Sequence, residues 1–119
     1  MTLRLERFGQ DALDGYVRGI AGSHAAAVQT AVRYYLDDWD SGRPAWRVPR
    51  LARNAVFAGA LEVDLPGDLH AELERESRRQ DVSADVLATH AVMYFLSDLD
   101  TGRAAARLGD AIDRDAEAN

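Results

Sequence analysis

The sequence predicts a mainly α-helical fold with a small two-stranded antiparallel ribbon, built from two similar units in one chain. Two stretches sixty positions apart are nearly the same: residues 32–43 read VRYYLDDWDSGR and residues 92–103 read VMYFLSDLDTGR. A repeat this close indicates one structural unit present twice. A unit of roughly 45 residues buries too little apolar surface to fold alone. We therefore expect the two copies to pack on each other.

The second unit begins with the clearest strand pattern. Residues 61–65 alternate apolar and polar side chains, as in a strand with one buried face. Pro66 ends this strand because proline has no N–H to donate. A stripe that repeats every four residues then predicts a short amphipathic helix: Leu69, Leu73 and Ser77.

A longer helix completes the second unit. Ser83 is the expected N-cap, with Asp85 in the first turn, where it favours the helix dipole. Gly102 is expected to end the helix in a left-handed conformation. The helix presents one broad apolar face: Val86, Leu87, Ala91, Val92, Phe95, Leu96 and Leu99.

The first unit repeats this plan less regularly. Residues 3–5 align with residues 63–65 and predict the first strand. Gly15 and Gly19 interrupt the first helix, and each costs about 1 kcal/mol relative to alanine. The apolar stripe of this first helix is Leu13, Val17 and Ile20. Ser23 aligns with Ser83 and predicts the start of the second helix, after a stop at Gly22. The second helix, closed by Gly42, buries Val28, Ala31, Val32, Tyr35, Leu36 and Trp39.

These patterns divide the chain into four segments. The two units are residues 1–43 and 61–103, joined by a basic connector of residues 44–60 and followed by an acidic tail of residues 104–119. Pro44 and Pro49 argue against a continuous helix in the connector. Three apolar side chains are expected to hold the connector on the core: Trp46, Val56 and Phe57. The tail is expected to be a frayed helix or disordered.

Composition limits the function. The chain has no cysteine, which excludes disulfides and cysteine-bound zinc. It shows no membrane-length apolar run and no apolar signal region after Met1, so we expect a cytoplasmic protein. The net charge of −6 disfavours nucleic acid as a partner. However, residues 41–61 contain no Asp or Glu and form a local positive segment with Arg43, Arg47, Arg50 and Arg53.

The order strand, helix, helix resembles the ribbon-helix-helix (Arc/MetJ-like) superfamily. Residues 61–103 carry the resemblance through Leu65-Pro66, Leu69, Leu73 and Ser83. Residues 3–43 carry it chiefly through the repeat, because Glu6 stands where the second unit has proline. The resemblance implies that the two copies pair their strands into one antiparallel ribbon and interlock four helices, so that one chain forms a tandem pseudo-dimer.

The resemblance also implies DNA binding, because family members lay the ribbon in the major groove. The strand residues expected to face outward are Thr2, Arg4, Glu6, Glu62 and Asp64. Arg4 can pair with guanine and a carboxylate can accept from cytosine. Three acids against one arginine are unfavourable beside phosphates, and a ribbon centred at positions 4 and 64 makes Arg4 and Asp64 neutralise each other. A ribbon that no longer contacts bases is the alternative.

Phosphate contacts are expected from two sources. Helix N-termini have free N–H groups that hold anions, here at Ser23-His24 and at Ser83-Ala84. The alternative for the serines is N-capping alone. The connector arginines Arg43, Arg47, Arg50 and Arg53 are the second source, or else they pair with the acidic helices. The aromatic residues at helical spacing are expected in the core: Tyr34, Tyr35, Trp39, Tyr94 and Phe95.

No catalytic arrangement is visible in the sequence. His24, His70 and His90 lack metal-ligand spacing, and there is no glycine-rich phosphate loop. The acid pairs Asp37-Asp38 and Asp98/Asp100 lie near helix C-termini, where we expect solvated carboxylates. The sequence therefore predicts a non-enzyme without catalytic residues, metal site or cofactor.

Two functions remain at this level. The first is a DNA-binding transcriptional regulator, repressor or antitoxin-like, whose partner is double-stranded DNA and which associates further on DNA. The second is a ribbon-helix-helix-derived protein-interaction module that no longer binds DNA. Its partner would be a protein captured through the acidic tail, from Asp110 to Asn119.

Overall fold

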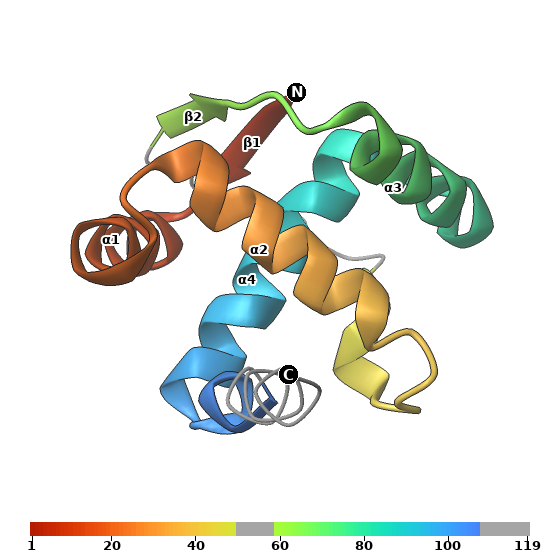
Figure 1. Cartoon of the computed structure of the whole chain (residues 1–119). Helices are drawn as coiled ribbons and strands as arrows, with labels where there is room; N and C mark the ends of the chain where they lie inside the picture. Colours follow the sequence, from red (N-terminus) through yellow and green to blue (C-terminus); the bar gives the residue numbers. More distant parts are fainter. Residues whose placement is uncertain (50–58, 108–119) are drawn as a thin grey trace, which may run out of the picture.

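The computed structural model describes residues 1–49 and 59–107. The described chain is mainly helical with one two-stranded antiparallel sheet, which confirms the predicted mainly α fold with a small ribbon (Figure 1). The elements are β1 (Thr2–Leu5), α1 (Arg7–Tyr16), the π-helical turn η1 (Val17–Ala21), α2 (His24–Asp37), the 3₁₀ turn η2 (Pro44–Trp46), β2 (Gly59–Glu62), α3 (Gly67–Gln80) and α4 (Ala84–Asp100).

The sheet pairs β1 with β2 in a register that differs from the expected one. Leu3 lies opposite Leu61, and Arg4 lies opposite Ala60 rather than Asp64. The second strand is also displaced from the predicted residues 61–65, since it begins at Gly59 and ends at Glu62. One further backbone bond follows, from the Val63 N–H to the Met1 carbonyl at 3.0 Å.

The alternation of buried and exposed side chains holds for most of the ribbon. Leu3 and Leu5 are buried, and so is Val63 just after β2. Leu65, also predicted to face the core, is only partly buried. The apolar side of the ribbon rests on the helices and closes one end of the core.

Helices α2 and α4 cross in the middle of the molecule, with α1 and α3 on opposite sides of them (Figure 1). Leu69, Leu73 and Ser77 of α3 are buried, as the four-residue spacing predicted. The fully buried centre comes from both units, including Val28, Val32 and Tyr35 of α2 and Leu87, Val92 and Phe95 of α4. Neither unit therefore closes this core by itself.

The helix ends follow the predicted chemistry with one exception. Ser23 and Ser83 are the N-caps of α2 and α4. Gly22 and Gly102 adopt the left-handed conformation, with φ of 81° and 84°. Gly42 is left-handed as well, but α2 already ends at Asp37.

The first helix of the first unit is less regular than predicted. It changes at Val17 into a π-helical turn, in which the Gly22 N–H donates to the Val17 carbonyl at 2.9 Å. Ile20, predicted in the buried stripe, is 75% exposed. The wider turn changes the helical spacing, and the open space around Gly15 and Gly19 shows that no neighbour packs there.

Two other apolar predictions are wrong, and one is confirmed. Val86 is 48% exposed because it lies in the first turn of α4, before the helix enters the core. Trp39 is 57% exposed beyond the end of α2, with the Arg79 guanidinium 5.7 Å from its ring centroid. Trp46 holds the connector as expected, because its ring stacks on Tyr35 at 5.0 Å. Val56 and Phe57 lie outside the described residues.

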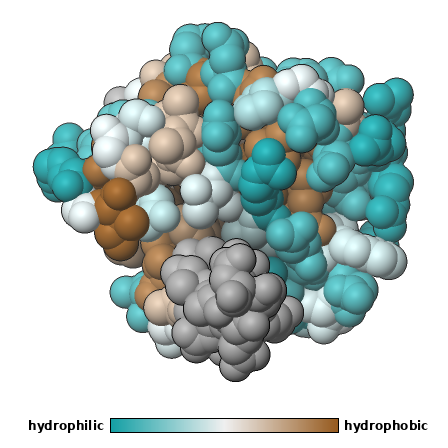
Figure 2. Space-filling model, in the orientation of Figure 1, coloured by the Kyte–Doolittle hydropathy of each residue, from teal (hydrophilic) through white to brown (hydrophobic). Residues whose placement is uncertain are grey.

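The surface differs between the two sides of the fold. The side of α3 is largely hydrophilic, whereas a hydrophobic patch shows on the side of α1 (Figure 2). The large exposed apolar residues of α1 and η1 are Phe8 and Ile20.

Within the described ranges, no helix is both long and apolar enough to cross a bilayer. Residues 103–107 are helical and Ala104 is fully buried, so the second unit runs past the predicted boundary at Arg103, while residues 108–119 lie outside the described part.

Candidate nucleic-acid interface and a buried polar cluster

The outer face of the ribbon presents the short set of side chains that alternate with the buried leucines. Arg4 is exposed in the middle of β1, and the residue opposite it is Ala60. The predicted pairing of Arg4 with Asp64 is therefore wrong, because the observed register moves Asp64 beyond the end of β2. Arg4 consequently has no carboxylate directly across the ribbon.

The acids of the ribbon lie toward its two ends. Glu62 faces Thr2, whose hydroxyl donates to the Glu62 carboxylate. The N-terminal ammonium of Met1 lies 3.8 Å from the same carboxylate. Glu6 follows β1 at the other end, and both Glu6 and Asp64 are exposed. The outer face thus combines a central cation with peripheral anions.

The N-termini of the two longer helices have the same cap. The Ser23 hydroxyl accepts from the Ala26 N–H at 3.1 Å, and the Ser83 hydroxyl accepts from the Val86 N–H at 3.2 Å. The predicted capping role is present at both sites. Each serine occupies one N–H of its helix end, which leaves others free.

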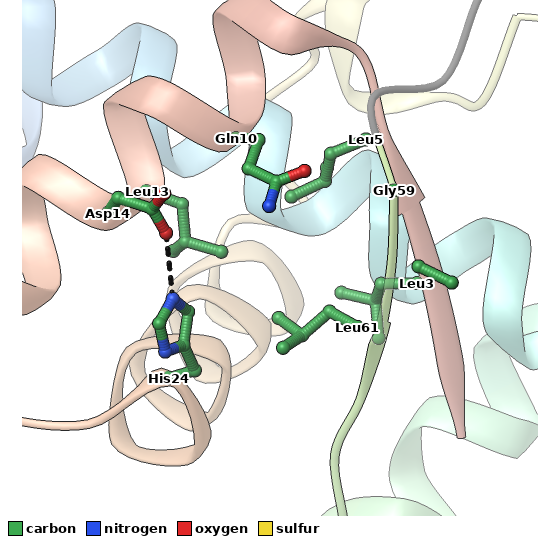
Figure 3. A pocket seen from close by; sticks show the side chains of 9 residues that line it. Leu3, Leu5, Gln10, Leu13, Asp14, His24, Gly59 and Leu61 are labelled. Atoms are coloured by element: carbon green, nitrogen blue, oxygen red, sulfur yellow. Dashed lines mark hydrogen bonds and ion pairs between the residues drawn. The ribbon is translucent and has the colours of Figure 1, made fainter.

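The surroundings of the two helix N-termini differ. At α2, His24 Nε2 lies 2.8 Å from Asp14 Oδ1, so this histidine pairs with a carboxylate of α1 (Figure 3). At α4, Asp85 lies in the first turn and competes with any anion for the helix dipole. The Arg4 N–H lies 3.4 Å from the Thr89 hydroxyl, which ties β1 to the second turn of α4.

A hollow accompanies each strand of the ribbon. A small cavity of about 40 Å³ lies between β2, α1 and the start of α2, with Gln10, Asp14 and His24 as its polar lining (Figure 3). A groove of about 720 Å³ runs beside β1 and the first turns of α4, with Arg4 and His90 among its lining residues. Burial lowers the pKa of His90, whose Nε2 is 3.0 Å from the Ala45 carbonyl oxygen.

The connector arginines do not act as one group. Arg43 donates two hydrogen bonds to Asp98, at 2.8 and 2.9 Å, so its guanidinium is engaged inside the molecule. Arg47 is exposed. Arg50 and Arg53, the other two candidates for phosphate contacts, lie outside the described residues.

Arg43 belongs to a polar cluster that the two units build together at the ends of α2 and α4. We call it the crossed cluster; it consists of Tyr34, Asp38, Arg43, Tyr94, Asp98 and Arg103. The first three residues come from the first unit and recur sixty positions later as the last three. Two copies of one pattern, Tyr-x₃-Asp-x₄-Arg, therefore meet at one place.

The contacts of the cluster run between the units. Tyr34 donates to Asp98 at 2.6 Å, and Tyr94 donates to Asp38. Arg43 binds Asp98, and Arg103 Nη2 binds Asp38 at 3.0 Å. Arg103 also donates to Asp98 of its own unit at 2.7 Å. Each carboxylate thus receives a hydroxyl and a guanidinium from the opposite unit.

The two carboxylates of the crossed cluster are buried, so their hydrogen bonds and ion pairs strongly affect their pKa values. The side chains of Asp98 and Asp38 are 1% and 7% exposed. Burial alone raises the pKa of Asp98, but hydrogen bonds from Arg43, Tyr34 and Arg103 outweigh it and hold the pKa at about 2. Burial likewise raises the pKa of Asp38, and bonds from Arg103 and Tyr94 reverse the shift to a net lowering. Both groups are buried carboxylates with charged partners.

The prediction that Asp38 and Asp98 are solvated helix ends is therefore wrong. The arginines that follow them fold back over the helix C-termini and supply the compensating charge. A signal for this existed in the sequence, since the tyrosine, aspartate and arginine recur together at one offset. The repeat alone did not show their burial, because Asp40 and Asp100 recur at the same offset and both are exposed.

A second, unsymmetrical contact lies beside the crossed cluster. The Tyr35 hydroxyl donates to the Trp46 carbonyl at 2.6 Å and accepts from Gln80 Nε2 at 2.7 Å. Burial raises the pKa of Tyr35 to about 12. At the equivalent position sixty residues later, Phe95 takes the place of Tyr35 and packs edge-on against Tyr16, with ring centroids 5.3 Å apart.

No candidate metal site is present in the described part of the chain. Across residues 1–49 and 59–107, no three His, Asp or Glu side chains group in a way that could hold a cation. Comparison of the chain with models of known protein families, with characterised proteins and with solved structures gave no significant match. The geometry of the chain alone therefore carries the functional argument.

Proposed function

We propose that this chain is a tandem ribbon-helix-helix pseudo-dimer in a single polypeptide. Three features support this arrangement. The order strand, helix, helix occurs twice, with β1 paired antiparallel to β2. The N-caps Ser23 and Ser83 occupy equivalent positions. The crossed cluster joins equivalent residues of the two units in a reciprocal way.

We further propose that the protein is a non-enzymatic, DNA-binding transcriptional regulator that inserts its ribbon in the major groove. The observation that carries this proposal is the free position of Arg4, exposed at the centre of the ribbon opposite Ala60. A two-stranded ribbon fits the major groove, and arginine is the commonest reader of guanine there. The Glu62 carboxylate is partly compensated by Thr2 and the N-terminal ammonium, which lessens its repulsion of phosphates.

Phosphate contacts in this function come from groups beside the ribbon. The free N–H groups at the starts of α2 and α4 flank β2 and β1 respectively, as the lining of the two hollows indicates. Exposed Arg47 adds a cation, and Arg50 and Arg53 remain sequence-based candidates. Arg43 is not proposed as a phosphate contact, because its guanidinium is hydrogen-bonded to Asp98.

The test is a titration of fluorescent duplex DNA at about 50 mM salt, where phosphate contacts are strongest. Random-sequence and genomic-fragment pools serve as DNA. Arg4→Ala is expected to weaken the tightest binding about 5- to 150-fold, which corresponds to one guanine contact of about 1–3 kcal/mol. Arg75→Ala, an exposed arginine in the middle of α3, is the matched control and leaves affinity unchanged. Absence of any binding at this salt concentration refutes the proposal.

A protein-interaction module is the second candidate, and the charges around the ribbon favour it. Glu6, Glu62, Asp64 and Asp85 outnumber Arg4 on and beside the exposed face. This surface suits a basic partner protein. The two functions make opposite predictions for Glu62→Gln with Asp64→Asn, which strengthens binding to DNA and weakens binding to a basic protein. A pull-down with and without residues 108–119 tests the acidic tail, and equal recovery of partners removes its role.

A further inference from the structure

The surface that joins the two units is chemically self-complementary. Each unit presents one tyrosine, one aspartate and one arginine of the crossed cluster, and each requires the same three groups from its partner. Nothing in these contacts distinguishes the second unit of the same chain from the second unit of another copy. Covalent connection alone favours the partner on the same chain, by raising its effective concentration to the order of millimolar.

The other contacts between the units are not reciprocal, but they too join the first unit to the second. Gly9 of α1 lies against Met93 of α4, and Tyr16 packs on Phe95. Gln80 of α3 reaches Tyr35 of α2. The ribbon itself pairs β1 with β2. All of these join the first unit to the second, so a second copy of the chain can supply every one of them.

The covalent link between the units allows such an exchange. Val48 is the last described connector residue held by a hydrogen bond, since its N–H donates to Gln80 at 3.0 Å, and β2 begins at Gly59. The ten residues from 49 to 58 reach at most about 35 Å when fully extended. The two shorter dimensions of the molecule are 32 and 28 Å, so this reach can join two paired bodies that lie side by side.

We propose that the interface between the units is also a recognition surface for a second copy of this chain. Two chains exchange second units, and each first unit meets the other chain's second unit across the crossed cluster. The product is a dimer with two ribbons, whose contacts are those of the single chain. This inference rests on the pseudo-dimer of the proposed function but not on DNA binding.

The test uses two full-length variants in which the charges of the crossed cluster are reversed in one unit only. One variant carries Asp98→Arg and Arg103→Asp, which reverses the second unit. The other carries Asp38→Arg and Arg43→Asp, which reverses the first unit. Within either variant like charges face each other. When the two variants exchange units, the unaltered first unit of one chain meets the unaltered second unit of the other. The two reversed units meet in the same way, so opposite charges face each other at both interfaces.

Mixing the two variants from denaturant is expected to give a one-to-one complex of twice the chain mass, measured by light scattering and native mass spectrometry. Neither variant alone is expected to give a folded monomer. The chain that combines all four substitutions is the matched control, because it restores opposite charges within one polypeptide and remains a monomer. A folded control together with no complex in the mixture overturns the proposal.

A second measurement tests the proposal if the chain with all four substitutions does not fold. Unlabelled and isotope-labelled wild-type chains are refolded together at about 1 mM, where exchange competes with pairing within the chain. A dimer of mixed mass that reverts slowly to monomers on dilution supports the exchange. Monomers only, at every concentration tested, overturn it. Neither measurement uses DNA, so failure to bind DNA is distinguishable from failure to exchange.

Discussion

Removal of one carboxylate from the crossed cluster should have a large effect on stability. Asp98 accepts from Tyr34 at 2.6 Å, from Arg43 at 2.8 and 2.9 Å and from Arg103 at 2.7 Å. Asp98→Ala deletes all of these bonds and leaves the charge of Arg43 without its main partner. Breaking a buried ion pair in this way costs about 3–5 kcal/mol.

The exposure of the arginines places the expected cost at the lower end of that range. The side chains of Arg43 and Arg103 are 32% and 34% exposed, so water can partly replace the lost carboxylate. Arg103 also keeps Asp38, at 3.0 Å. We expect a loss of about 3 kcal/mol, which is a large share of the roughly 5–15 kcal/mol typical of a small domain.

Urea unfolding followed by circular dichroism measures this loss. For a slope of about 1–3 kcal/mol/M, the midpoint of Asp98→Ala falls by about 1 M or more. Asp100→Ala is the matched control, because Asp100 is exposed at the same end of α4. The control should stay within about 0.5 kcal/mol of the wild type. Equal midpoints for the two variants would show that the crossed cluster does not stabilise the fold.

Three further predictions follow from burial and hydrogen bonding. Because the pKa of Asp98 is about 2 in the folded chain and about 3.9 when unfolded, its contribution of about 2 kcal/mol is present above pH 4 and lost toward pH 2, as pH-dependent urea midpoints should show. Ser23→Ala and Ser83→Ala should each cost about 1 kcal/mol, measured by thermal unfolding, and a serine whose loss has no effect is not a cap. Tyr35→Phe should cost about 1–3 kcal/mol by removing the hydroxyl that bonds the buried Trp46 carbonyl and Gln80 Nε2, and a urea midpoint unchanged from wild type would contradict this.

Several parts of the fold could be predicted from local chemistry. The caps at Ser23 and Ser83 and the left-handed glycines Gly22 and Gly102 depend on a few neighbouring atoms, so the residue types were sufficient to predict them. The burial of Leu69 and Leu73 follows from helical spacing on one face. Ile20 was predicted incorrectly because the π-helical turn changes that spacing.

The candidate site was harder to predict, because it depends on which residues face each other. Alternation along a strand shows that Arg4 points outward, but only the pairing with β2 shows that Ala60 lies opposite. Arg43 looked like a phosphate contact because its neighbours in sequence are basic and its partner, Asp98, is distant in the chain. The charge pattern of one segment does not show which carboxylates from a distant segment will contact its arginines in the folded protein.

The amino-acid order by itself determined that strand, helix and helix follow one another twice along the chain, because apolar spacing and cap residues act over a few positions. Only the tertiary structure decided the ribbon register and the partners of Asp38, Asp98 and Arg43. Those outcomes depend on contacts between residues far apart in the chain. Their energies arise when both units pack together and exclude water from the carboxylates.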